Sequence, residues 1–173
     1  MARVKKNYLF VDGYNIINSW SELNYLTKFS LEDARDALID DMAEFASLTG
    51  EKVVIVFDAY RSDSTREVYE DVSKVKIVYT KAYQTADSFI EKEVDRLARR
   101  ENVRVCTGDN QIQQLALERG ATRLTASELK AELFSKRKSI KRAKKKDFQA
   151  NRKSFSLSKD FLDKLEEIGK GIK

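Results

Sequence analysis

The chain of 173 residues contains no histidine and no proline, and it has only one cysteine. Without histidine there can be no Ser-His-Asp or Cys-His catalytic site, no imidazole general base and no histidine-ligated zinc. Hydrolytic chemistry would therefore rest on carboxylates, lysine or a metal ion with hard oxygen ligands, for which Mg²⁺ and Mn²⁺ are suited. The lone Cys106 lies inside an apolar run, so we expect a buried side chain and no disulfide.

Long apolar runs are also missing. No stretch approaches the roughly 18 residues of a membrane span, and the first residues lack the apolar core of a signal peptide. We therefore expect a cytoplasmic protein with no membrane partner. With 42% apolar and 35% charged residues, the chain has the composition of a globular protein that can bury a sizeable core.

Charge is distributed unevenly along the chain. Residues 1–135 hold 19 Lys and Arg against 23 Asp and Glu, whereas residues 136–173 hold 14 against 5. This predicts an acidic globular domain over 1–135 and a basic C-terminal extension over 136–173. The run KRKSIKRAKKK is either a segment that binds RNA phosphates or a solvated cationic helix. Its eight cations are Lys136, Arg137, Lys138, Lys141, Arg142, Lys144, Lys145 and Lys146.

The end of the extension carries apolar residues at helical spacing. They predict an amphipathic helix that folds back onto the body. The residues of this stripe are Leu157, Phe161, Leu162, Leu165 and Ile168.

Short apolar runs alternate with helical patterns along the body. Strands are predicted at 8–11, 53–57, 76–79, 103–106 and 121–124, and helices at about 30–47, 85–98, 111–118 and 127–135. The polar segment 59–74 is expected to hold a short helix around 66–72. This alternation predicts a three-layer α/β/α domain in which helices cover both faces of a mostly parallel sheet.

Aspartates recur where these strands end. Asp12, Asp58 and Asp109 follow three of the strands, and Asp87 lies at the start of the helix after a fourth. Parallel strands bring their carboxyl ends to one edge of the sheet, so we expect the four carboxylates to gather there. Two charges about 4 Å apart repel by ~4 kcal/mol at an effective dielectric of about 20. A divalent cation removes this repulsion and supports phosphodiester hydrolysis without histidine.

Each of these acids also has a purely structural interpretation. Asp12 and Asp109 could cap turns, and Asp58 could accept hydrogen bonds from its own loop backbone. Asp87 could lie near the start of a helix because a negative charge there interacts favourably with the helix dipole. Asn15, three residues after the first aspartate, could orient a phosphate or the attacking water, or only stabilise the turn.

Other candidates have similar alternatives. Arg35 could reach a phosphate or form a salt bridge on the helix surface. Arg61 and Arg66, in the long polar segment, could contact RNA, since that segment is longer than a connection requires. Trp20 and Tyr25 could stack on bases or anchor their segment on the core.

Four segments together resemble a known family. YLFVDGYNII, VVIVFDAY, QTADSFIEKEV and VCTGDNQIQ, in this order, are similar to NYN-type nuclease domains of the PIN-like superfamily, in particular the bacterial YacP group. The resemblance covers about residues 6–133. It implies a metal-dependent endoribonuclease with Asp12, Asp87 and Asp109 in an acidic Mg²⁺ or Mn²⁺ centre and with Asn15 and Asp58 near it.

The resemblance also implies that the substrate is mRNA and that the ribosome is a partner. Many PIN domains have a buried acid in the first long helix, and here Asp36, Asp40 and Asp41 compete for that role. The hypothesis from the sequence is an endoribonuclease, and its alternative is a non-catalytic module that binds RNA or the ribosome on the same fold.

Overall fold

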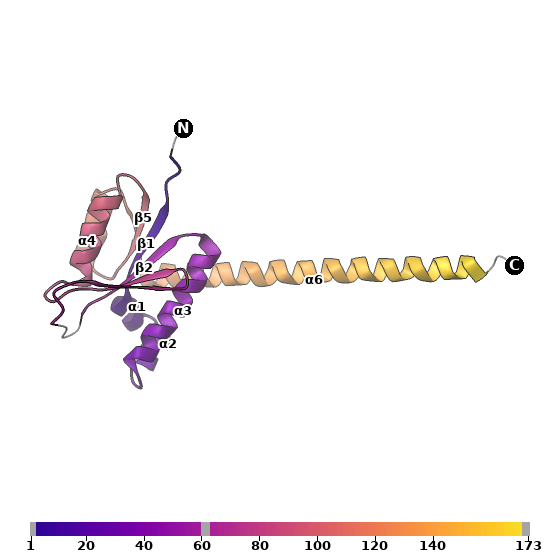
Figure 1. The fold of residues 1–173 in the computed structure, drawn as a ribbon, viewed down its shortest axis with the longest axis horizontal. Helices are drawn as coiled ribbons and strands as arrows, with labels where there is room; N and C mark the ends of the chain where they lie inside the picture. Colours follow the sequence, from indigo (N-terminus) through magenta and orange to yellow (C-terminus); the bar gives the residue numbers. More distant parts are fainter. Residues whose placement is uncertain (1–2, 60–62, 171–173) are drawn as a thin grey trace. The chain divides into compact units, whose positions relative to one another are not determined.

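The computed structural model describes residues 3–59 and 63–170. Within 153–170, side chains are described only for Lys159, Leu162, Asp163, Lys164, Glu166 and Glu167. The strands are β1 (Asn7–Asp12), β2 (Lys52–Phe57), β3 (Val68–Val72), β4 (Val75–Tyr79), β5 (Asn102–Cys106) and β6 (Thr122–Leu124). The helices are α1 (Gly13–Ser19), α2 (Ser21–Leu26), α3 (Leu31–Thr49), α4 (Ala86–Leu97), α5 (Asn110–Glu118) and α6 (Ala126–Lys170) (Figure 1).

The strands form one sheet in the order β3-β4-β2-β1-β5-β6. β1 lies at the centre and pairs in parallel with β2 and β5; β2 and β4 are also parallel, as are β5 and β6. Only β3, at one edge, runs antiparallel to its neighbour. The parallel strands therefore end at a common edge, as the sequence predicts.

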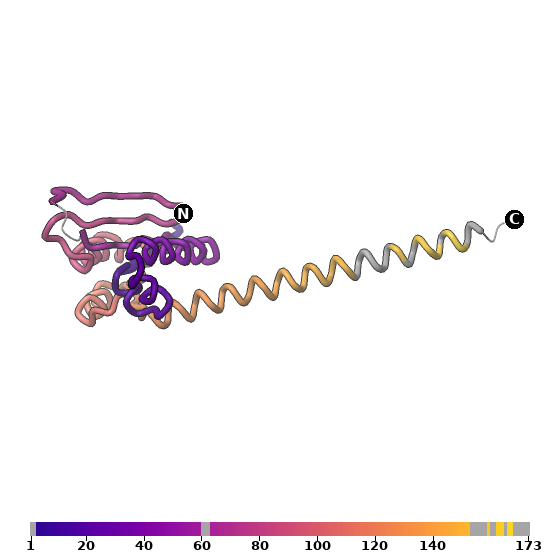
Figure 2. Tube along the Cα trace, turned by 90° about the horizontal axis from the view of Figure 1, so that it is seen from below, coloured from indigo at the N-terminus to yellow at the C-terminus, as the bar shows by residue number. Residues whose placement is uncertain are grey.

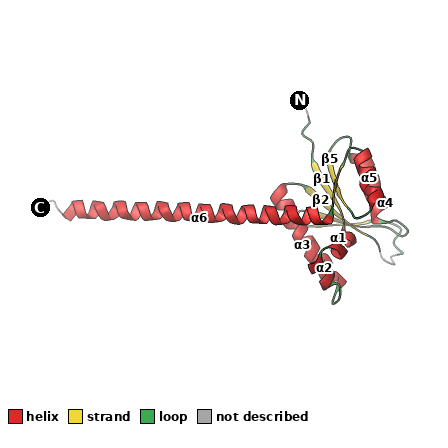
Figure 3. Cartoon of the chain, turned by 180° about the vertical axis from the view of Figure 1, so that it is seen from behind, coloured by secondary structure: helices red, strands yellow, loops and turns green. Residues whose placement is uncertain are grey.

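Two apolar clusters lie on opposite faces of the sheet. One contains buried residues of α1, α2, α3 and the first turns of α6, and the other contains those of α4 and α5. Alternate residues of β1 supply both clusters, because Leu9 and Val11 face one side and Phe10 faces the other. Figure 3 shows helices around the yellow strands, and the predicted three-layer α/β/α arrangement is confirmed.

The predicted helix around 66–72 is wrong, because this segment forms the edge strand β3. Val68 and Val72 are four residues apart, which suits a helix, but they also share one side of a strand. A two-residue turn at Ser73 and Lys74, with Ser73 in the left-handed region at φ 54°, pairs Val72 with Val75. The hairpin appears in Figure 2 as two neighbouring stretches of tube. Hydrogen bonds to β4 thus decide between the two conformations.

The chain divides into two compact units, Met1–Leu133 and Phe134–Lys173. The basic run 136–146 is helical and belongs to α6. Of the predicted apolar stripe, the side chain of Leu162 is exposed, and those of Leu157, Phe161, Leu165 and Ile168 lie outside the described residues. No helix in the described part of the chain is both long and apolar enough to span a membrane.

Candidate active site

The four predicted aspartates converge at the carboxyl edge of the sheet. Asp12 is the last residue of β1, Asp58 follows β2, and Asp109 lies three residues after β5. Asp87 arrives from another direction, as the second residue of α4. The Asp58 carboxylate accepts a hydrogen bond from the backbone N–H of Ala86, which ties the end of β2 to the start of that helix.

Each aspartate also has a structural hydrogen bond. Asp12 caps α1 by accepting from the Asn15 N–H at 3.2 Å, and Asp109 caps α5 by accepting from the Gln111 and Ile112 N–H groups at 2.7 and 3.3 Å. In all these bonds, and in that of Asp58, the acceptor is Oδ1. The capping interpretation is therefore correct for Asp12 and Asp109, and it leaves Oδ2 of each carboxylate for a ligand.

The electrostatics show that the carboxylates share one site. The pKa of Asp12 is raised to about 6, first because burial disfavours the charged form and then because Asp87, Asp58 and Asp109 repel it. The Asn15 N–H opposes this rise. Burial, followed by repulsion from Asp109 and Asp58, also raises the pKa of Asp87. The site is thus a partly buried concentration of negative charge.

The donor set suits a divalent cation that keeps part of its water shell. No three acidic or cysteine side chains among the described residues lie close enough to hold a metal ion by themselves. Mg²⁺, however, is usually held by one or two carboxylates, with waters and substrate phosphates completing its octahedron. Asn15 Oδ1 is buried and accepts no hydrogen bond from the described residues, so a bound cation or a water would satisfy it.

The side-chain amide of Asn15 lies directly against Gly108 on the neighbouring turn. A Cβ atom added at Gly108 would lie 2.3 Å from Asn15 Nδ2, a distance that real Cβ contacts do not reach. Gly108 therefore allows the turn between β5 and α5 to pack directly on the amide of α1. The functional and turn-stabilising interpretations of Asn15 are both compatible with this contact.

We expect Gly108→Ala to lower activity by about tenfold or more while changing the free energy of unfolding little, because the new methyl group displaces the Asn15 amide. Cleavage rates and thermal melting of the variant measure the two effects. The control is a double-mutant cycle with Asn15→Ala, in which Gly108→Ala should have no further effect. Additive losses in the cycle would show that Gly108 acts independently of Asn15.

One residue of the site was missed by the sequence interpretation. The Thr107 side chain is buried; its hydroxyl donates to Asp87 Oδ1 at 3.5 Å and accepts from the Asp109 N–H at 3.2 Å. Thr107 thus joins two aspartates from different elements and orients Asp87. Its position in the sequence could have identified it, since Thr107 lies between the predicted strand 103–106 and Asp109 of the same turn.

Two clefts flank the aspartates. A cleft of about 260 Å³ is lined by Asp58, Arg35 and Tyr14, and the Arg35 guanidinium donates to the Tyr14 hydroxyl at 3.4 Å. Arg35 forms no ion pair with another described residue, so the salt-bridge alternative is wrong. A second cleft of about 420 Å³ adjoins Asn15 and contains Lys130, a cation that the sequence interpretation overlooked.

Other candidates lie apart from the aspartates. Asp36 and Asp40 of α3 line a separate cleft with Glu70 and Tyr79, and neither contributes to the pKa shifts of Asp12 and Asp87. The structure thus groups these two acids with a different cleft, and a helix acid in the centre stays a prediction.

The remaining candidates divide between anchors and surface residues. Trp20 is buried and donates to the Ala126 carbonyl at 2.9 Å, which confirms the anchor interpretation. Tyr25 is exposed and packs edge-on against Phe29. Arg66 is exposed just before β3, and Arg61 lies outside the described residues.

The parallel sheet, its helical layers and the acidic edge define an α/β domain of NYN type. The model for the YacP-like NYN domain matches residues 9–170, and the chain belongs to that family. It is 35% identical over 165 residues to the uncharacterized protein YacP of Bacillus subtilis (strain 168), covering 94% of this chain and 96% of that protein.

Solved structures agree with this assignment. The crystal structure of Rae1 (YacP) from Bacillus subtilis superposes with a TM-score of 0.68 at 34% identity over 95% of each chain. The crystal structure of a point mutant of the same Bacillus subtilis protein gives 0.67 at 37% identity over 79% of this chain and 80% of that one. The resemblance noted in the sequence is confirmed, and the family supports a nuclease-type function that acts on RNA.

Proposed function

We propose that the protein is a metal-dependent endoribonuclease that cleaves mRNA in association with the ribosome. The observation that carries the proposal is the group of four aspartates. Burial, and then repulsion by the other three carboxylates, raises the pKa of Asp12 to about 6, and the nearby Asn15 Oδ1 has no hydrogen-bond partner among the described residues. A protein that only binds RNA gains nothing from a negative site, since RNA itself is negative. Membership in the YacP-like NYN family supports an RNA substrate.

In this proposal Asp12, Asp87 and Asp109 would hold Mg²⁺ or Mn²⁺ partly through the waters of its shell, and Asp58 supports them. The ion, when bound, supplies a Lewis acid for the phosphoryl group and lowers the pKa of water near it. Thr107 keeps Asp87 oriented, and Asn15 positions the scissile phosphate or the attacking water. Hydrolysis with inversion at phosphorus leaves a 3′ hydroxyl and a 5′ phosphate.

The flanking clefts supply a route for a single strand of RNA. Arg35 lies in the cleft that Asp58 lines, and Lys130 lies in the cleft that Asn15 and Gly108 line. Lys130 already pairs with Glu22 at 2.6 Å, whereas Arg35 contacts only the Tyr14 hydroxyl among the described polar groups. Arg35 is therefore the better candidate for a phosphate contact beside the centre.

The direct test is to incubate the purified protein with end-labelled mRNA, naked or on translating ribosomes, with Mg²⁺, Mn²⁺ or EDTA. We expect internal cleavage with either metal, faster on ribosomes, and no cleavage in EDTA. Cleavage that persists in EDTA would contradict metal dependence. Binding without cleavage under every condition would favour the alternative, a non-catalytic module that binds RNA or the ribosome.

The basic run of α6 is expected to supply much of the RNA affinity. If about five of its cations meet phosphates of single-stranded RNA, the slope of log K against log salt is about −3.5. Replacing Lys144, Lys145 and Lys146 by Gln should then make the slope shallower by about 2 and weaken binding. Fluorescence anisotropy with labelled RNA between about 50 and 200 mM salt measures both quantities.

A matched control removes three cations elsewhere on the same helix. Arg152, Lys159 and Lys164 are exposed and lie beyond the basic run, so their replacement by Gln should change the slope much less. Equal effects of the two triple variants would mean that the run acts only through net charge and not as a specific RNA contact.

A further inference from the structure

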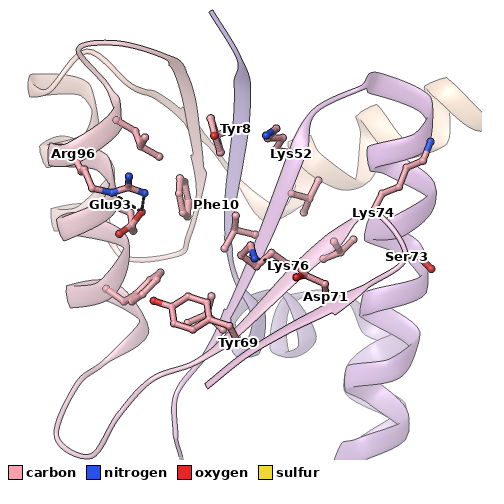
Figure 4. A pocket seen from close by; sticks show the side chains of 16 residues that line it. Tyr8, Phe10, Lys52, Tyr69, Asp71, Ser73, Lys74, Lys76, Glu93 and Arg96 are labelled. Carbon is pink, nitrogen blue, oxygen red and sulfur yellow. Dashed lines mark hydrogen bonds and ion pairs between the residues drawn. The ribbon is translucent and has the colours of Figure 1, made fainter. Parts of the chain in front are cut away.

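A cavity of about 530 Å³ lies apart from the aspartates (Figure 4). Its lining includes Tyr8, Lys52 and Val75, which lie at the beginnings of β1, β2 and β4, whereas the aspartates follow strand ends. None of the four aspartates contributes to this lining. The cavity therefore has its own lining, which runs along this face of the sheet from the beginnings of β1, β2 and β4 to Val78.

The cavity exists because the sheet is wider than its helical cover on this face. α4 packs mainly on β1, β2 and β5, whereas β4 and β3 extend past it to the edge of the sheet. Strand register places Val54 beside Lys76, and Val78 beside Tyr69, on the same face. In Figure 4 the labelled Glu93 and Arg96 of α4 form one wall and the β3–β4 hairpin forms the other.

The floor of the cavity is apolar and aromatic. Phe10, Val78 and Phe89 are buried there, and two tyrosines extend them toward the opening. The ring of Tyr8 stacks on Phe10, with centroids 6.3 Å apart, and the ring of Tyr69 lies 6.5 Å from Phe89. Tyr69 is half exposed, so part of its ring can still be covered by a ligand.

The rim of the cavity carries an excess of positive charge. Two of its cations are paired, because Lys76 contacts Asp71 at 3.0 Å and Arg96 binds Glu93. Lys52 and Lys74 form no ion pair with any residue that the structure describes. They are neighbours across the sheet, since Val53 pairs with Val75 in the register of β2 and β4.

We propose that this cavity binds a nucleotide, with its base on the aromatic and aliphatic floor and its phosphate at Lys52 and Lys74. The two parts of the site favour this ligand together. An aliphatic anion would leave the aromatic floor unused, and an uncharged aromatic molecule would leave the two lysines unpaired. The volume is within the usual range for sites of small ligands. The nucleotide is either a free molecule or one residue of an RNA strand.

The test uses isothermal titration calorimetry on the full chain in EDTA, with AMP, adenosine and ribose 5-phosphate as probes. We expect AMP to bind one site per chain, about tenfold or more tighter than either fragment, because only AMP uses both floor and lysines. The double variant Lys52→Gln/Lys74→Gln should weaken AMP binding by about tenfold or more. Tyr69→Leu should weaken AMP binding but leave that of ribose 5-phosphate unchanged.

The matched control is Lys28→Gln. Lys28 lies over the ring of Tyr25 at 5.4 Å, as Lys52 lies over Tyr8 at 5.6 Å, but it does not line the cavity. Its replacement should leave AMP binding unchanged. Equal weakening by Lys28→Gln, or ribose 5-phosphate binding as tightly as AMP, would overturn the proposal, because the lysines would then attract anions without a base site.

Hexaadenylate distinguishes the two sources of the ligand. If it binds about tenfold or more tighter than AMP and still depends on Lys52 and Lys74, the cavity holds one residue of an RNA strand. If AMP binds as tightly as hexaadenylate, the ligand is a free nucleotide. If neither probe responds to the double variant, the cavity is not a nucleotide site.

Discussion

Asp12→Asn is expected to abolish RNA cleavage while leaving the fold intact, and Asp87→Asn and Asp109→Asn are expected to do the same. Each substitution removes a carboxylate that we propose as a metal ligand and preserves the shape of the side chain. The asparagine at positions 12 and 109 can still cap α1 and α5, because an amide oxygen accepts the same backbone hydrogen bonds. We expect each cleavage rate to fall by at least about a hundredfold.

The measurement is the single-turnover cleavage rate of mRNA at saturating Mg²⁺, together with circular dichroism to check the fold. Asp36→Asn is the matched control, since Asp36 is exposed on α3 and lines a different cleft. It should keep the parental rate. Parental rates in any two of the three site variants would show that the aspartates do not form a shared catalytic centre.

These aspartates could be found from the sequence because of one geometric rule. Parallel strands end at one edge, so an acid after each strand predicts a cluster without knowledge of the strand order. The rule does not find Asp87, because this residue reaches the centre from the start of α4 and not from a strand end, so a second argument is needed. Its place in the predicted helix, three residues before the buried Ile90, was the signal.

Features that depend on partners distant in the sequence were not predictable. The spacing of Val68 and Val72 fits a helix, and only pairing with β4 makes the segment a strand. The contact between Gly108 and Asn15 joins a turn to a helix residue 93 positions away in the chain, and no local pattern indicates it. The nucleotide cavity arises from the difference between the width of the sheet and its helical cover, which is a property of the whole fold.

The same substitution that abolishes cleavage is expected to stabilise the metal-free protein. Ionised Asp12 is costly in the folded state, because it is partly buried and repelled by three aspartates, and this raises its pKa from 3.8 to about 6. A rise of this size corresponds to about 3 kcal/mol at neutral pH. Asp12→Asn removes the charge and keeps the helix cap, so its free energy of unfolding should be higher by up to about 3 kcal/mol.

The dependence on pH identifies the cause. Below about pH 3 the Asp12 carboxyl is largely protonated in both the folded and the unfolded protein, so it does not destabilise the folded state. As the pH rises from about 4 to about 6, the unfolded protein loses this proton first, and the parent loses stability relative to the variant. The difference in melting temperature between Asp12→Asn and the parent should therefore be near zero at about pH 3, grow between about pH 4 and pH 6, and reach its maximum above pH 6.

Thermal melts in metal-free buffer across this pH range measure the difference, and Asp36→Asn should show no such trend.

Added Mg²⁺ should then raise the melting temperature of the parent more than that of Asp12→Asn, because an ion that binds only the folded state stabilises it more when its affinity is higher. A parent that melts higher than Asp12→Asn at pH 7.5 without metal would refute the penalty that burial and repulsion impose on ionised Asp12. A variant that gains as much from Mg²⁺ as the parent would instead show that Asp12 is not a metal ligand, so the two results separate the electrostatic claim from the catalytic one.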